Sequence, residues 1–277
     1  MFSTLASVLV TAAVSLAPQT PVPDLGQKFG AAARDPSLVV PLILETSELL
    51  SRVDGATGQR LADASEPFLR QVFFSPQRFP GAEKLGLREH VVASGELPGS
   101  IAKRYRIGAG LLRYLNPDYD ERKIVAGRRL VVLDLSNGSL QLIVDKERCR
   151  LAAWHKTPDG EHVLSMYVPI GIGASESPTP SGTTKIVDRV RNPAWTNPLT
   201  REVHPHGDPR NLLGGYWIRL DSQGIGQSGI GLHGYTGSPA PDWIERGASN
   251  GCVRLLQSDA DRVFELALEG TQVVLAP

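Results

Sequence analysis

Two side chains near the end of this chain have the types and the spacing that nucleophilic catalysis requires. Cys252 lies between Gly251 and an apolar stretch, and His233 precedes Gly234 earlier in the same segment. A cysteine attacks as its thiolate, and because a free thiol has a pKa of about 8.5, a nearby imidazole is its usual base. The connecting loop is rich in Gly, Pro, Ser and Asp, so it can fold back and bring the two together. Ser249 and Gly251 permit a tight turn whose amides converge on a developing oxyanion.

The other cysteine and the other histidines predict no second reactive centre. Cys149 lies in the alternating stretch KERCRLAAW, which favours a small buried side chain without a catalytic role. His204 and His206 frame a proline and could join His233 at a metal, but a thiolate bound to zinc could not attack a peptide. We therefore expect neither a metal nor a cofactor. Three histidines lie in or beside strand-like stretches and are expected at the surface: His90, His155 and His162.

Composition and charge exclude one class of partner. The chain of 277 residues is 41% hydrophobic and 21% charged, as in an ordinary globular protein. Its 29 basic side chains balance 29 acidic ones, so no basic field points to nucleic acid. The 28 glycines and 21 prolines cluster in connecting stretches, which favours strands and loops over a helical bundle. The length suits two small domains, or one domain with appendages.

The first segments predict export. Residues 1–17 form an uncharged apolar run with Ser15 and Ala17 at a possible cleavage site, so we predict a signal peptide. No basic residue precedes the run and Pro18 follows it, which leaves a short helix packed on the protein as the alternative. The run is too short to predict a membrane span. Residues 18–36 carry four prolines and are predicted to be a linker. We expect a periplasmic or cell-wall location.

The rest of the chain divides into three predicted parts. In residues 37–80 the spacing of Leu and Phe predicts two amphipathic helices broken by Gly55 and Gly58. Residues 88–134 predict a compact unit of strand, helix, helix and strand. From residue 138 to 277 strand patterns dominate, and Ser258 with Asp261 predicts the start of a helix before the final strand. The fold class is therefore α+β and β-rich.

The C-terminal motifs resemble a known enzyme family. The pattern is His233-Gly234, then S-x-G-C-V-R-L from Ser249, then D-A-D-x-V-F-E-L and G-T-x-V, and upstream a loop containing Thr179, Pro180 and Gly182. It resembles the catalytic domain of the L,D-transpeptidases, the YkuD-type family, over roughly residues 139–276. The resemblance implies a β-sandwich domain with a C-terminal helix and an enzyme that acts on peptidoglycan.

Residues 88–134 resemble a second family, the LysM peptidoglycan-binding module. The matching positions include Val91, Gly95, Ile101, Tyr105 and the Asn116-Pro117 pair. One departure is Pro98-Gly99, which is expected to shorten the first helix. The resemblance implies glycan binding on a unit separate from the chemistry, and a spacer without binding remains the alternative.

The L,D-transpeptidase resemblance implies a role for each site residue. Cys252 would be the acylated nucleophile and His233 the base, oriented by the Gly234 carbonyl, with the amides of Gly251 and Cys252 as the oxyanion hole. Residues expected to shape the loop or bind substrate are Ser249, Asn250, Arg254, Tyr235 and Trp217. For Arg254, bracing of the loop through backbone carbonyls is the competing interpretation. Asn250 replaces a residue that is often basic in the family and Tyr235 a common threonine, which bears on substrate preference and thiolate pKa.

The implied reaction is a 3,3 cross-link between stem peptides with loss of a terminal D-alanine, through a thioester. The implied partners are peptidoglycan glycan strands and stem peptides, and a monomer is expected. Two alternatives stay open from the sequence. In the first, water accepts the acyl group, giving a carboxypeptidase or hydrolase, or a different amine accepts it, giving an enzyme that attaches proteins to the wall. In the second, the chain is a non-catalytic peptidoglycan-binding protein.

Overall fold

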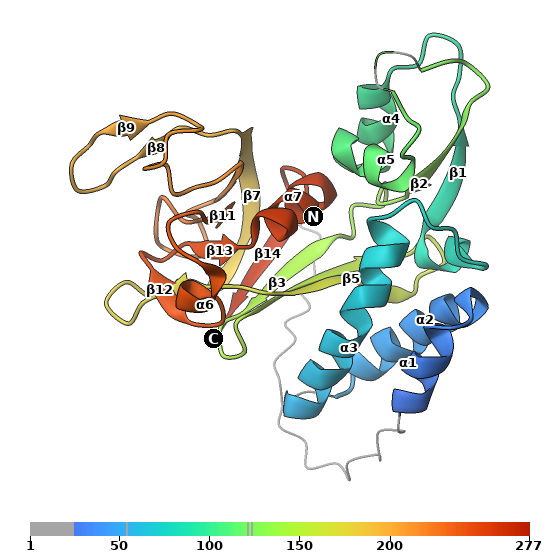
Figure 1. Ribbon diagram of the computed structural model, residues 1–277, viewed down its shortest axis with the longest axis horizontal. Helices are drawn as coiled ribbons and strands as arrows, with labels where there is room; N and C mark the ends of the chain where they lie inside the picture. The colour runs from blue at the N-terminus through green and yellow to red at the C-terminus, as the bar shows by residue number, and fades with distance from the viewer. Residues whose placement is uncertain (1–24, 54, 121, 123) are drawn as a thin grey trace, which may run out of the picture.

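The strands of the C-terminal part form one mixed sheet in the computed structural model, which describes residues 25–277 except 54, 121 and 123. The predicted signal peptide and the first part of the predicted linker lie outside the described residues. Eight strands pair in the order β13-β11-β10-β7-β14-β3-β4-β5. Their bounds are β3 (Gln141–Asp145), β4 (Arg150–Lys156), β5 (His162–Pro169), β7 (Gly182–Arg191), β10 (Tyr216–Leu220), β11 (Gly231–Gly234), β13 (Val253–Leu255) and β14 (Gln272–Ala276). In Figure 1, β11 and β13 lie at the left, and β3 and β5 extend toward the N-terminal helices at the right.

The predicted α+β, β-rich class is confirmed. β3 alternates half-buried and buried residues, the pattern of a strand with one face on the core. The final strand β14 lies in the interior of the sheet, pairing in parallel with β3 and antiparallel with β7. Two small ribbons complete this part: β6 (Ile172–Gly173) with β12 (Gly247–Ser249), and β8 (Trp195–Thr196) with β9 (Val203–His204). A short helix α6 (Ala240–Trp243) precedes β12.

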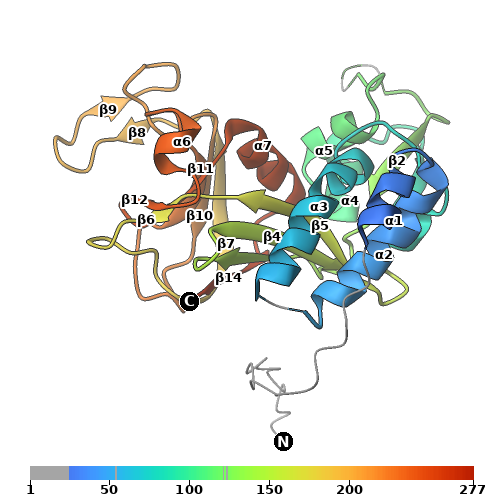
Figure 2. The ribbon, with the colours of Figure 1, turned by 60° about the horizontal axis from the view of Figure 1, so that its bottom comes forward.

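Three helices pack together at the β5 end of the sheet, and the second and third of them contact β5 (Figure 2). They are α1 (Gly26–Ala32), α2 (Val39–Leu50) and α3 (Gly55–Phe73), with a 3₁₀ turn η1 (Pro36–Leu38) between the first two. The linker prediction is wrong for α1, because Phe29 packs against Phe68 of α3 at 5.8 Å between ring centroids. The predicted break also moves: α3 begins at Gly55 and includes Gly58, where a Cβ would lie 2.7 Å from the Val53 carbonyl oxygen.

The predicted strand, helix, helix and strand order is present in residues 87–133. β1 (Leu87–Val91) pairs antiparallel with β2 (Arg129–Leu133), and α4 (Pro98–Tyr105) and α5 (Ala109–Leu115) lie between them in the chain. A 3₁₀ turn η2 (Ala82–Leu85) precedes β1. The expectation that Pro98 shortens α4 is wrong. Proline occupies the first helical position, where its missing N–H has no intrahelical partner to lose.

One helix, α7 (Gln257–Leu266), joins this N-terminal region to the strands of the predicted site. One side of α7 packs on β10, β11 and β13. Two other residues of α7 contact the N-terminal helices. Arg262 donates to the Glu66 carboxylate of α3 at 2.7 Å, and the Glu265 carboxylate accepts the N–H of Gly110 of α5 at 2.7 Å. The predicted units therefore share a packed interface and do not stand apart. The helix starts at Gln257 without a side-chain cap, so the predicted capping box is wrong.

Two of the three histidines expected at the surface are buried. His155 lies beneath Phe73 of α3, with Nε2 3.0 Å from the Leu85 carbonyl oxygen and Nδ1 2.6 Å from Ser165 Oγ. His90 contacts Tyr105 and Glu96 inside the unit of residues 87–133. Each ring fills both of its hydrogen-bonding positions, which allows burial. Only His162 is exposed as predicted.

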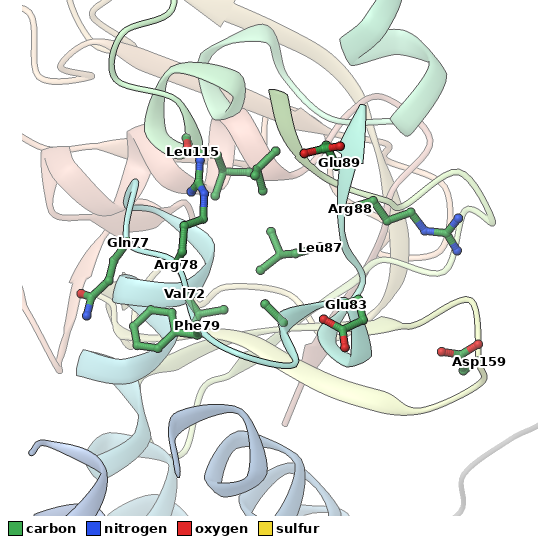
Figure 3. A pocket seen from close by; sticks show the side chains of 12 residues that line it. Val72, Gln77, Arg78, Phe79, Glu83, Leu87, Arg88, Glu89, Leu115 and Asp159 are labelled. Carbon is green, nitrogen blue, oxygen red and sulfur yellow. Dashed lines mark hydrogen bonds between the residues drawn. The ribbon is translucent and has the colours of Figure 1, made fainter. Parts of the chain in front are cut away.

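A hollow of about 530 Å³ opens between the end of α3, β1 and the turn before β5 (Figure 3). Its lining is apolar at Val72, Phe79 and Leu87, and Arg78 reaches across to donate to the Leu115 carbonyl oxygen at 2.7 Å. None of the predicted site residues lines it. Over the part of the chain that the structure describes, no helix combines the length and the apolar character needed to cross a membrane.

Candidate active site

Strand alternation places the predicted nucleophile and base on one face of the sheet. β11 and β13 pair in parallel, with Leu232 opposite Val253 and His233 opposite Arg254. Leu232 and Val253 are fully buried, so both point into the core. Successive strand residues point to opposite faces. His233, Arg254 and Cys252, the residue before Val253, therefore share the other face.

The Gly234 carbonyl fixes the form of the His233 ring. Nδ1 of His233 lies 2.6 Å from that carbonyl oxygen. A carbonyl only accepts hydrogen bonds, so Nδ1 carries the hydrogen and Nε2 keeps its lone pair. Burial lowers the pKa of His233 from the usual 6.5 to about 4, while the Gly234 carbonyl raises it and the Arg254 charge lowers it further. The imidazole is neutral at neutral pH and can accept a proton at Nε2.

The Cys252 thiol is protonated at rest. Burial raises the pKa of this thiol above its ordinary range, and the Gly231 backbone amide and the Arg254 charge oppose that shift. Its Sγ donates to the Gly229 carbonyl oxygen at 3.6 Å. The resting pair is thus a neutral thiol and a neutral imidazole. With the roles expected from the sequence, Cys252 as nucleophile and His233 as base, proton transfer would accompany the attack on substrate.

The loop before Cys252 is held by hydrogen bonds on both sides of the nucleophile. Ser249 Oγ donates to the Cys252 carbonyl oxygen at 2.6 Å, and Thr179 Oγ1 donates to the Gly251 carbonyl oxygen at 2.9 Å. Gly251 has φ +100°, a conformation that L side chains rarely adopt, and a Cβ there would lie 3.0 Å from Ile230 Cδ1. The tight turn expected from the sequence is present.

Among residues 25–277 as described, no hydrogen bond joins the Arg254 side chain to a loop carbonyl, in contrast to the bracing of the competing interpretation. The guanidinium carbon of Arg254 lies 3.8 Å from the centroid of the Tyr235 ring, a cation–π contact. Its Nε is buried without a hydrogen-bond partner among the described residues. Burial lowers the pKa of Arg254, which still carries its charge at neutral pH. The cation therefore lies beside the thiol with an aromatic ring as its support.

The remaining predicted residues surround the pair. Trp217 of β10 is opposite His233 of β11, with ring centroids 5.9 Å apart. The Tyr235 ring lies 6.5 Å from the His233 ring, edge-on. Asn250 is exposed at the turn. Their roles toward substrate stay predictions.

Sequence reasoning missed Gln257, the first residue of α7. Its side-chain oxygen accepts the Gly215 N–H at 3.2 Å. A Cβ at Gly214 would lie 2.0 Å from this amide, and one at Gly234 would lie 2.4 Å from it. Gln257 therefore packs directly against the residue whose carbonyl orients His233. The available signal was the glycine at both contact positions, but nothing in the sequence connects them with Gln257.

The histidines considered as metal ligands lie apart from this arrangement. His204 is buried in the β8–β9 hairpin, stacked on Trp195 with ring centroids 5.5 Å apart. His206 follows it in the exposed loop. In residues 25–277, leaving aside the three positions without a description, no three His, Cys, Asp or Glu side chains are grouped to hold a metal. Cys252, His233 and the loop before Cys252 form a site of the class that carries out covalent acyl transfer through a thioester.

Comparison with known proteins gives the family. Residues 139–275 match the L,D-transpeptidase catalytic domain family, YkuD. A Bacillus subtilis (strain 168) protein that carries the name L,D-transpeptidase YkuD is 26% identical over 189 residues, covering 66% of this chain and 96% of that protein. YcfS of Escherichia coli (strain K12), also named as an L,D-transpeptidase, is 28% identical over 202 residues, covering 66% of this chain and 60% of its own. The C-terminal part of this chain thus belongs to the L,D-transpeptidase catalytic domain family.

Among solved structures, an L,D-transpeptidase from Mycobacterium smegmatis aligns with a TM-score of 0.39 and 16% identity, over 56% of this chain and 65% of that one. An Enterococcus faecium L,D-transpeptidase aligns with a TM-score of 0.37 and 21% identity, over 50% of this chain. The alignment spans 49% of the Enterococcus chain.

Proposed function

We propose that this protein is a peptidoglycan L,D-transpeptidase in which Cys252 is the nucleophile and His233 the base. The observation that carries the proposal is that Cys252 directly precedes β13, the strand that pairs with β11, and that His233 on β11 has its free nitrogen fixed as Nε2 by the Gly234 carbonyl. The family of the C-terminal part supports the same chemistry.

The first step forms the thioester. Cys252 Sγ attacks the carbonyl carbon of the third stem residue while His233 Nε2 takes the thiol proton. The carbonyl oxygen becomes an oxyanion, which the amides of Gly251 and Cys252 would receive. The C–N bond to the terminal D-alanine then breaks, and its nitrogen leaves with the proton from His233.

The second step releases the enzyme. An amine of another stem attacks the thioester carbon and gives its proton to His233, and the C–S bond breaks as the sulfur regains a proton. A 3,3 cross-link results. With water as the acceptor, the same intermediate gives a carboxypeptidase.

Mass spectrometry of muropeptides tests the reaction. After incubation with a purified disaccharide tetrapeptide, we expect a cross-linked dimer with one D-alanine lost. Cys252→Ala should reduce product by at least about 1,000-fold, since the nucleophile is removed. Cys149→Ala is the matched control, because Cys149 is buried with its thiol on the Lys146 carbonyl oxygen. Loss of product in the Cys149 variant, or its persistence in the Cys252 variant, would refute the assignment.

The substrate places the working enzyme outside the cytoplasm, and the apolar run in residues 1–17 supports export. The unit of residues 87–133 would bind glycan strands as a LysM module. Its strand, helix, helix and strand order supports this. Sedimentation of the intact chain with insoluble sacculi, with chitin oligosaccharide as competitor, tests glycan binding. We expect a monomer in solution, which light scattering measures.

A further inference from the structure

Thr179 makes two hydrogen bonds through its side-chain hydroxyl, one as acceptor and one as donor. The residue is 3% exposed and lies in the loop between β6 and β7. Its Oγ1 accepts the N–H of Gly173 at 2.8 Å and donates its single hydrogen to the Gly251 carbonyl oxygen at 2.9 Å. A buried hydroxyl with both roles filled holds its partners in one orientation. The Gly251 carbonyl is thus tied to a strand outside its own loop.

That carbonyl belongs to the same peptide plane as the Cys252 amide. The described chain contains no cis peptide bond, so the Cys252 N–H points away from the Gly251 carbonyl within this plane. Because Thr179 holds the carbonyl on one side, the N–H is directed to the opposite side. In the described part of the chain no group accepts a hydrogen bond from this amide. The next peptide is fixed too, since Ser249 Oγ donates to the Cys252 carbonyl oxygen.

We infer that Thr179 is a positioning residue that aims the Cys252 backbone amide at the oxyanion formed during acylation. The inference rests on the proposed function and adds a residue that does not touch the substrate. Gly251 supplies the backbone freedom for the turn, with φ +100°, and this freedom makes an external restraint necessary. Without the hydroxyl, the peptide between Gly251 and Cys252 can rotate and the amide loses its direction.

The test compares a reaction that develops an oxyanion with one that does not. Acylation by a carbapenem forms the Sγ–C bond at the lactam carbonyl through a tetrahedral oxyanion, and then breaks the ring C–N bond as the nitrogen takes a proton. Alkylation by iodoacetamide displaces iodide at a saturated carbon, with no oxyanion. Both rates are followed by mass spectrometry of the intact protein.

Thr179→Val keeps the shape and removes the hydroxyl, and Thr179→Ser keeps the hydroxyl. We expect Thr179→Val to slow acylation by about 10- to 100-fold, approaching the loss of one oxyanion donor, while alkylation changes by less than about twofold. Thr179→Ser should restore acylation to within about threefold of the parent chain. Thr184→Val is the matched control, because it removes a buried hydroxyl that donates to the Asp221 carbonyl oxygen at 2.6 Å, away from the nucleophile loop.

Each other outcome overturns the inference. Equal loss of acylation and alkylation in Thr179→Val would mean that the loop collapses and that Thr179 only maintains the fold. Unchanged acylation would mean that the amide needs no restraint, and failure of Thr179→Ser to restore it would assign the effect to the methyl group. If the parent chain itself forms no carbapenem adduct at Cys252, the proposed function fails first, and this result is distinguishable from the others.

Discussion

The chemistry of this site depends on a thiol and an imidazole that are both neutral before substrate binds. Burial acts on the two groups in opposite directions, raising the pKa of Cys252 and lowering that of His233 to about 4. Burial disfavours the charged form of each group. In the proposed mechanism the thiolate therefore forms during the attack, when the proton passes to Nε2 of His233. Arg254 is the cation that lowers the pKa of both residues.

Replacement of Arg254 should shift the pH dependence of Cys252 alkylation. Arg254→Met keeps much of the side-chain length and removes the charge that lowers the Cys252 pKa. We expect the alkylation midpoint to move to higher pH, with the rate at pH 7 falling by about three- to tenfold and the rates converging at high pH. Stopped-flow alkylation across pH gives the profile.

Arg246→Met is the control variant. It removes a positive charge from an exposed residue that directly precedes β12. It should leave the midpoint in place. A midpoint that stays fixed in Arg254→Met, or one that moves equally in both variants, would remove Arg254 from this role.

At the scale of elements, α7 is the part on which the site and the N-terminal region both depend. Two glycines of the α5 start, Gly108 and Gly110, lie directly against Glu265 of α7. A Cβ at Gly110 would lie 2.4 Å from the Glu265 side chain, and Gly108 donates its N–H to the Glu265 carbonyl oxygen at 2.7 Å. There is no space for a side chain at this contact.

Gly110→Ala should therefore destabilise the protein by about 1–3 kcal/mol, the usual effect of adding a methyl group to a close-packed contact. Gly99→Ala in α4 is the control, because a Cβ there meets nothing within 4 Å. It should be neutral or stabilise by up to about 1 kcal/mol. Urea unfolding midpoints measure both. Equal midpoints for the two variants would show that the α5–α7 contact is loose.

The order of elements could be predicted from the sequence because it depends on local patterns. The alternation of apolar and polar residues predicted the strands, and the motif around Cys252 predicted the tight turn before it. Contacts between distant segments could not be predicted. The burial of His155 depends on Leu85 and Ser165, and α1 depends on Phe68 of α3. Thr179 was visible as part of a motif, but its bond to Gly251 appears only when β6 and β12 pair.

At the scale of the whole molecule, the contacts of α7 predict a single unfolding transition. The four tryptophans, at positions 154, 195, 217 and 243, all lie in the C-terminal part, whereas α2 and α3 supply much of the helix. Tryptophan fluorescence thus reports on one part and far-ultraviolet circular dichroism largely on the other. We expect the two urea curves to coincide. Two separated transitions would show that the N-terminal region unfolds independently and would restore the separate domains expected from the sequence.

Acid should destabilise the protein through its two buried neutral imidazoles. His155 and His233 each have a folded-state pKa of about 4 against 6.5 in the ordinary state. Between these values the unfolded chain binds more protons, so stability is full above pH 6.5 and falls as the pH drops toward 4. Each histidine contributes a slope of about 1 kcal/mol per pH unit in this window.

His155→Phe should be less stable than the parent chain at pH 7.5, since two hydrogen bonds are lost. Between pH 6.5 and 4 its free energy of unfolding should fall less steeply than that of the parent, because the contribution of His155 to the slope is removed. The exposed His162 provides the control, and His162→Asn should keep the parent slope. Urea unfolding at several pH values measures the slopes. An unchanged slope in His155→Phe would mean that His155 is not buried in its neutral form.

The protonated state of Cys252 also bears on how the protein tolerates oxidants. Peroxide oxidises the thiolate of a cysteine, and the protonated sulfur reacts far more slowly. Burial favours the protonated sulfur. In the proposed mechanism the proton leaves only when an acyl donor is bound. A nucleophile in an oxidising environment would thereby escape conversion to sulfenic acid between turnovers. It would do so without a second reactive thiol, because Cys149 is itself buried.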